Sequence, residues 1–178
     1  INPVGGFDAF LVKCNSSGAL QWVKTIGGTG TDVGLQVETG AQNKVYISVF
    51  TGSGTLKAAD SVLSSPSSGI LRFDTDGNFE AVITAGMVLY DMKIYQNAIY
   101  ARSQVNVLSK FNLTGTVIWS KPISGTTASN NIVLTSPETS LEITPHGNII
   151  FAQSCQGNYS YDGVTVNSGT GTYVIASL

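Results

Sequence analysis

The sequence predicts an all-β fold in which hairpins of two kinds alternate along the chain. Three observations lead to this prediction. The composition favours strands, because Val, Ile, Thr, Tyr and Phe are frequent while Gly, Asn, Ser and Asp gather between the apolar runs. One hairpin pattern occurs three times, and a second pattern occurs between its copies. No segment keeps strong helix formers at helical spacing, so no long helix is expected.

The first hairpin pattern is an alternating strand, a turn and a second strand. A basic residue comes two positions before Asn or Asp, and a Gly follows three positions later. The three copies contain Lys13, Asn15 and Gly18, then Arg72, Asp74 and Gly77, then Lys110, Asn112 and Gly115. The Asn or Asp side chain starts such a turn and the Gly adopts positive φ, so each copy predicts two antiparallel strands with one buried face.

The second hairpin pattern lies between these copies. Its second strand is predicted at Val45–Phe50, Ile99–Arg102 and Ile149–Ala152, each directly after a polar turn. A shorter strand precedes each turn, at residues 34–37, 92–95 and 141–144. Four short strands therefore recur every ~40 to 60 residues, which is the spacing of propeller blades.

This recurrence predicts a β-propeller with blades of four antiparallel strands. About three blades plus edge strands are expected, in a single domain over residues 1–178. The predicted units cover residues 7–68, 69–105 and 106–170, and residues 171–178 start a further blade; an extra loop, Thr51–Ser68, lengthens the first unit. Closed propellers have about four to eight blades, so we expect part of a larger propeller, or else open edges that pair with another chain.

The first unit, residues 7–50, resembles the SBBP-type β-propeller repeat. The resemblance rests on the segments Phe7–Gly18 and Ile26–Gly34 and on Trp22 between them. Later units match less well, since Ala81 takes the place of the Trp in the second unit. The resemblance implies a propeller of secreted or cell-surface bacterial proteins, or of large viral proteins, and it implies no catalytic site.

Charge and hydropathy exclude several classes of protein. Only 11% of the 178 residues are charged, and the formal net charge is −2. Nucleic-acid binding is not expected, because no basic stripe is present. Membrane insertion is not expected either, because no apolar stretch approaches the roughly 20 residues of a membrane helix.

The sequence offers no catalytic, cofactor or metal site. Cys14 and Cys155 lack metal-ligand spacing, and we expect two separate core residues, with a disulfide in an oxidising compartment as the alternative. Asp74–Asn78 begins like a calcium loop, but the equivalent turns lack its acidic residues and no Glu stands at the twelfth position. The Gly-rich segment Gly27–Gly30 is expected to be a turn, and His146, the one histidine, an exposed turn residue.

Two sets of residues remain as candidates for binding or modification. Trp22 and Trp119 could form an aromatic binding surface, although core packing is the favoured interpretation. Glycosylation sequons occur at Asn15, Asn112 and Asn158, and the first two are expected at exposed turn tips.

These observations predict a non-catalytic propeller module that acts as a binding or display scaffold, either extracellular, at a cell surface, or on a virion. A protein or glycan partner is expected. Two alternatives remain open: a structural subunit of an extracellular or viral assembly that self-associates through edge strands, and the propeller portion of a larger enzyme.

Overall fold

A computed structural model describes residues 5–52, 55–59, 61–64, 68–85, 87–104, 107–122, 140–161 and 164–177. Side chains are described for these residues except 41, 63, 64, 85, 140 and those beyond 152. The described chain is all-β, with one short 3-10 turn, η1 (Ala41–Asn43). Within it, no helix has the length and apolar character needed to cross a membrane.

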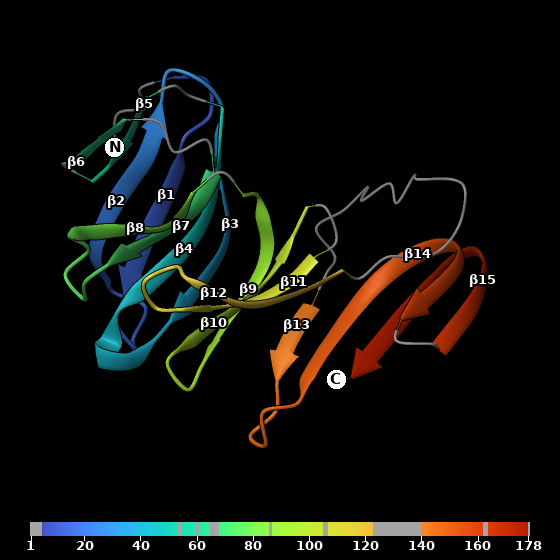
Figure 1. The fold of residues 1–178 in the computed structure, drawn as a ribbon. Helices are drawn as coiled ribbons and strands as arrows, with labels where there is room; N and C mark the ends of the chain where they lie inside the picture. The colour runs from blue at the N-terminus through green and yellow to red at the C-terminus, as the bar shows by residue number, and fades with distance from the viewer. Residues whose placement is uncertain are drawn as a thin grey trace.

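The described strands form four antiparallel sheets (Figure 1). The first sheet has the order β1 (Ala9–Cys14), β2 (Leu20–Gly28), β5 (Thr55–Ala58) and β6 (Ser61–Ser64). The second sheet contains β3 (Asp32–Thr39), β4 (Val45–Thr51), β7 (Ser68–Phe73) and β8 (Phe79–Ala85). The third sheet contains β9 (Leu89–Tyr95), β10 (Ala98–Ser103), β11 (Val107–Asn112) and β12 (Val117–Pro122). The fourth contains β13 (Ser140–Ile143), β14 (Ile149–Tyr161) and β15 (Val164–Ser177).

The sheets of the structure are offset by one hairpin from the repeat units of the sequence. Each predicted unit begins with a hairpin of the first pattern, whereas the second and third sheets each begin with a hairpin of the second pattern. β7 and β11, which start the predicted units, are thus the third strands of their sheets. Residues 171–177 lie in β15, which holds the same third place in the fourth sheet.

Three apolar cores separate the four sheets. The core between the first and second sheets includes Leu11, Ile26, Ile47, Leu71 and Phe73. The next core includes Tyr46, Ile70, Met92, Ile99 and Phe111. The last includes Tyr100, Leu108, Leu141, Ile149 and Phe151. The central strands β4, β7, β10 and β11 alternate between two of these cores, so these strands are buried on both faces.

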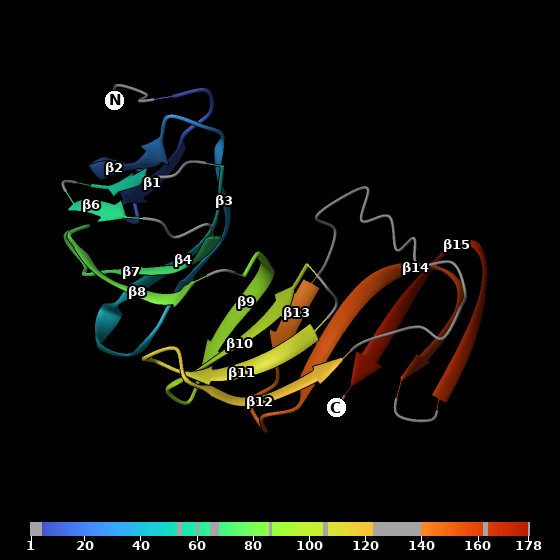
Figure 2. The ribbon, with the colours of Figure 1, turned by 45° about the horizontal axis from the view of Figure 1, so that its top comes forward.

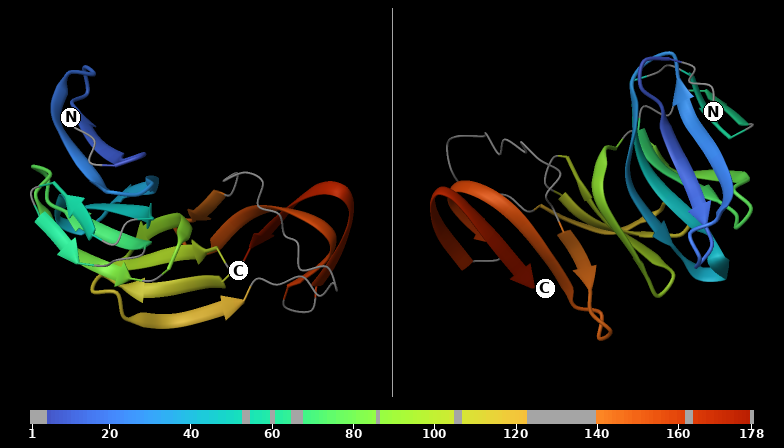
Figure 3. Two further views of the ribbon diagram at one scale, coloured as in Figure 1. Left: turned by 90° about the horizontal axis from the view of Figure 1, so that it is seen from above. Right: turned by 180° about the vertical axis from the view of Figure 1, so that it is seen from behind.

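The first strands of successive sheets lie side by side. β9 contacts β3 on one side and β13 on the other, and β1 contacts β3. Figures 2 and 3 show the sheets as a curved row in which the first and fourth sheets occupy opposite ends. Ion pairs connect the row, since Lys93 Nζ lies 2.9 Å from a carboxylate oxygen of Glu38 on β3 and 3.5 Å from one of Glu142 on β13.

Three expectations from the sequence are wrong. The segment Gly27–Gly30 is not wholly a turn, because Gly27 and Gly28 end β2 and pair there with Lys57 and Leu56. The extra loop predicted over Thr51–Ser68 contains the hairpin β5–β6, which pairs with β2 and extends the first sheet, because Leu56 and Ala58 alternate into the first core and are fully buried. Cys14 is an exposed free thiol at the end of β1 and not a core residue. The side chain of Cys155 lies outside the described residues.

Candidate functional site

The turns of the first hairpin pattern share one geometry. In the first copy, the side-chain oxygen of Asn15 accepts the N–H groups of Ser17 and Ala19, at 3.0 and 2.9 Å. Asp74 and Asn112 accept the corresponding pairs of N–H groups in their turns. Gly18, Gly77 and Gly115 all have φ between 78° and 88°, so the predicted turn chemistry is confirmed.

The surroundings of these turns differ from sheet to sheet. The turn at Gly18 has open space around it, so a side chain there would meet nothing within 4 Å. The turn at Gly77 packs onto Trp22 and Lys24 of β2, in the preceding sheet. The turn at Gly115 packs against the backbone of Ile83 on β8, again in the preceding sheet. These turns therefore connect each sheet to its predecessor wherever a described predecessor exists.

A hollow of about 460 Å³, here named the first-sheet cleft, lies where the first and second sheets meet. Its walls come from β1, β2, β3, β4, η1 and the turn between β7 and β8. The lining residues are Leu11, Val12, Lys13, Trp22, Val37, Thr39, Asn43, Val45 and Thr75. Apolar groups form most of this wall, and the ammonium, indole, amide and hydroxyl groups supply the polar atoms.

One backbone carbonyl fixes the two most distinctive side chains of the cleft. The carbonyl oxygen of Thr75 accepts a 2.8 Å hydrogen bond from Lys13 Nζ and a 3.0 Å hydrogen bond from Trp22 Nε1. An ammonium has three donors, so Lys13 keeps two after this bond is made. The indole is likewise held with its N–H directed at the turn, and its ring lines the cleft.

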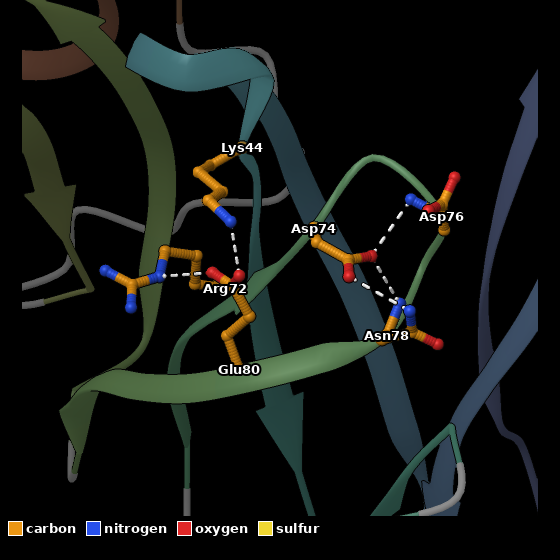
Figure 4. A network of polar contacts seen from close by, with 6 residues as sticks. All are labelled: Lys44, Arg72, Asp74, Asp76, Asn78 and Glu80. Atoms are coloured by element: carbon orange, nitrogen blue, oxygen red, sulfur yellow. Dashed lines mark hydrogen bonds and ion pairs between the residues drawn. The ribbon is translucent and has the colours of Figure 1, made fainter.

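The turn that carries Thr75 is itself braced by polar contacts (Figure 4). Asp74 accepts hydrogen bonds from the Asn78 side chain at 2.9 Å and from the N–H groups of Asn78 and Asp76, which together hold the pKa of Asp74 below its ordinary value. On the adjoining strand, Glu80 forms ion pairs with Lys44 and, at 3.0 Å, with Arg72. The position of the Thr75 carbonyl is therefore set by the fold and not by a ligand.

A second polar group lies deep between the third and fourth sheets. Burial raises the pKa of Asp91 to about 6, although the N–H groups of Met92 and Leu141 and the charge of Arg102 act in the opposite direction. Asp91 stands opposite Arg102 in the β9–β10 register, and both residues are buried. Across the part of the chain that is described, no three His, Cys, Asp or Glu residues gather as metal ligands.

The residues proposed from the sequence are not brought together. Trp22 lines the first-sheet cleft, whereas Trp119 packs between the third and fourth sheets with its ring 6.2 Å from that of Tyr100. Asn15 lies in the exposed turn, and Asn112 lies in the turn that packs on β8. Asn158 lies in β14 opposite Asn167, with its side chain outside the described residues. His146 is exposed in the turn before β14, as expected.

Sequence reasoning missed the other lining residues of the cleft. The sequence shows Lys13 as one of three repeated basic residues, but the three make different contacts. Arg72 pairs with Glu80, and Lys110 Nζ lies 4.9 Å from the centre of the Tyr100 ring. Thr75 contributes a backbone oxygen, which no side-chain pattern could indicate. No protein-family model matches this chain, and no curated protein matches it.

Proposed function

We propose that the chain is a non-catalytic β-propeller repeat module that serves as a surface binding scaffold, with the first-sheet cleft as its binding site. The observation that carries this proposal is the pairing of Lys13 and Trp22 on one carbonyl oxygen, beside an apolar wall. A concave, mostly apolar site with a few fixed polar groups is the usual form of a ligand site.

The order and contacts of the sheets support the propeller. The third sheet is a four-stranded meander in chain order, and the first strands of the second, third and fourth sheets (β3, β9 and β13) lie side by side. Propeller blades are four-stranded sheets arranged around a channel that their first strands line, so neighbouring first strands must be in contact. The resemblance of residues 7–50 to the SBBP-type repeat supports the same proposal, and with it an extracellular, cell-surface or virion location.

The partner we propose is a protein segment or a glycan that reaches into the cleft. The Trp22 ring offers an aromatic surface for stacking, and Lys13, Thr39 and Asn43 offer hydrogen-bonding groups around it. None of these groups is poised beside a base that would activate it, so the proposed role is binding.

Selection from a glycan array and from a displayed peptide library tests this proposal. Ligands so found are expected to lose affinity for Lys13→Met, while Lys110→Met, the equivalent position in the third sheet, keeps wild-type affinity. The chain has only two Trp residues, so ¹⁵N NMR gives an internal control: the Trp22 indole signal should shift and the Trp119 signal should stay. Ligands that bind Lys13→Met unchanged and leave the Trp22 signal in place would contradict the proposal.

A further inference from the structure

One edge of the first sheet has no described partner. β1 pairs with β2, and no other described strand pairs with it. The equivalent strands β7, β11 and β15 are each paired on that second edge, by β4, β10 and β14. All three of these pairings are antiparallel. The pairings of β7, β11 and β15 therefore indicate which kind of strand would pair with the open edge of β1, namely an antiparallel strand equivalent to β4, β10 and β14.

The face of β3 next to this edge is also uncovered. Val37 pairs with Ile47, as Met92 pairs with Ala101 and Leu141 pairs with Phe151, so the three are equivalent in their sheets. Met92 is 0% exposed and Leu141 is 1% exposed, whereas Val37 is 50% exposed. Since the residue type is apolar at all three positions, the difference lies in what covers them.

A tyrosine from the preceding sheet covers the two buried positions. Tyr46 of β4 shares a core with Met92, and Tyr100 of β10 shares a core with Leu141. Each tyrosine lies on the second strand of its sheet, the strand that pairs with β7 or β11. The described first sheet contributes no such tyrosine to its core with the second sheet. The open edge of β1 and the uncovered side chain of Val37 thus mark one and the same place, where the first-sheet cleft lies.

We propose that the first-sheet cleft accepts a β-hairpin of the chain's own repeat type, supplied by a further repeat unit. The second strand of this hairpin pairs antiparallel with β1, and its tyrosine covers Val37. The inference rests on the proposed function in that it takes the cleft as the binding site and assigns the partner. Addition of a strand to an open sheet edge is an established mode of recognition, in which main-chain hydrogen bonds give affinity and alternate side chains give specificity.

The register of this pairing follows from the other sheets. Tyr46 stands opposite Arg72, and Tyr100 stands opposite Lys110, whose Nζ lies 4.9 Å from the tyrosine ring centre. Lys13 is the equivalent basic residue of β1. We therefore expect the incoming tyrosine opposite Lys13, with its ring in contact with both the Lys13 ammonium group and the Val37 side chain.

A synthetic peptide of residues 89–103, which contains β9 and β10, is a suitable probe. Titration calorimetry with the whole chain is expected to give saturable binding, and hydrogen–deuterium exchange is expected to slow over residues 10–13. Replacing the tyrosine, as Tyr100→Ser in the peptide, should weaken binding. In a second form of the experiment, the same peptide is joined to the protein ahead of Ile1 by a Gly–Ser linker. The linker raises the local concentration of the peptide to about the millimolar range, so binding no longer depends on how well the free peptide folds.

Two valines of β3 provide matched protein variants. Val37→Lys should lower peptide affinity by about tenfold or more, because it replaces an apolar contact by a charge. Val33→Lys changes a valine that is 39% exposed on the opposite face of the same strand, and it should alter affinity by less than about twofold.

The outcomes separate this inference from the proposed function. Absence of binding by the free peptide, together with no slowing of exchange in β1 by the linked one, would overturn the inference. Binding that Val37→Lys leaves unchanged, or equal binding of unrelated strands without the tyrosine, would overturn it as well. If glycans or other peptides nevertheless depend on Lys13, the cleft remains a binding site and only the assigned partner is wrong.

Discussion

Gly18 and Gly115 occupy the same turn in different surroundings, and alanine at each position should give very different losses of stability. Both have positive φ, 81° and 88°, where an L-residue costs roughly 1–2 kcal/mol. At Gly18 a Cβ would meet nothing within 4 Å, so Gly18→Ala should lower the free energy of unfolding by about 1–2 kcal/mol.

At Gly115 the same Cβ would lie 1.7 Å from the carbonyl oxygen of Ile83 and 2.8 Å from its carbon. Backbone atoms cannot rotate away, so the turn must withdraw from β8, at a further cost of about 1–3 kcal/mol typical of overpacking. Gly115→Ala should therefore cost about 2–5 kcal/mol in all. Urea denaturation followed by circular dichroism measures both variants.

A third substitution separates the backbone cost from the contact cost. Asn tolerates left-handed φ better than Ala does, so Gly18→Asn should recover part of the loss, while Gly115→Asn should not. Equal destabilisation of Gly18→Ala and Gly115→Ala would refute the reasoning, because it would mean that the contact between the turn and β8 contributes nothing.

Three further outcomes are expected. Leu56→Ala should cost about 2–5 kcal/mol, because Leu56 is 0% exposed in the core that β5 shares with the second sheet, whereas Val62→Ala on the next strand, 64% exposed, should stay within about 0.5 kcal/mol by urea denaturation. Burial raises the folded-state pKa of Asp91 from 3.8 to about 6, so its stabilising contribution is complete below pH 3.8 and is lost as pH rises through about 6. The wild-type free energy of unfolding should thus fall relative to that of Asp91→Asn between about pH 4 and about pH 6.5, by on the order of 1–3 kcal/mol, and urea denaturation at several pH values measures this fall. Glu80→Gln removes two partly exposed ion pairs and should cost less than about 1 kcal/mol, an amount that 1 M NaCl largely abolishes in thermal melts.

Much of the strand order could be predicted because the turns are local devices. The side chains of Asn15, Asp74 and Asn112 each accept hydrogen bonds from the N–H groups two and four residues later. A few neighbouring residues in the sequence are therefore enough to indicate the hairpin. A fourth turn has the same main-chain hydrogen bonds, with Gly147 at φ 87°, and Thr144 Oγ1 accepts the N–H of Asn148, four residues later. A hydroxyl group stands here in place of the Asn or Asp side chain, so the sequence pattern that indicates the other three turns does not include this one.

The pairing of β5 with β2 and the shape of the cleft could not be predicted from the same patterns. Leu56 and Ala58 do alternate, but nothing local indicates that they return to a strand formed some thirty positions earlier. The cleft depends on the carbonyl oxygen of Thr75 and on the absence of a described cover over Val37, and both are consequences of how distant strands meet. Sequence periodicity indicates which face of a strand is apolar, not which neighbour covers it.

The path of the chain through β4, β5, β6 and β7 restricts how these repeats can be exchanged. After β4 the chain leaves the second sheet, adds β5 and β6 to the first, and returns to the second sheet as β7. The two sheets are therefore interlaced, and a recombination point anywhere between β2 and β7 would leave one of them without strands. A junction between β8 and β9 divides no sheet. Repeats can thus be duplicated or exchanged at the junction between β8 and β9 without dividing a sheet, but not at a point within the first two sheets. These two sheets must therefore be inherited together.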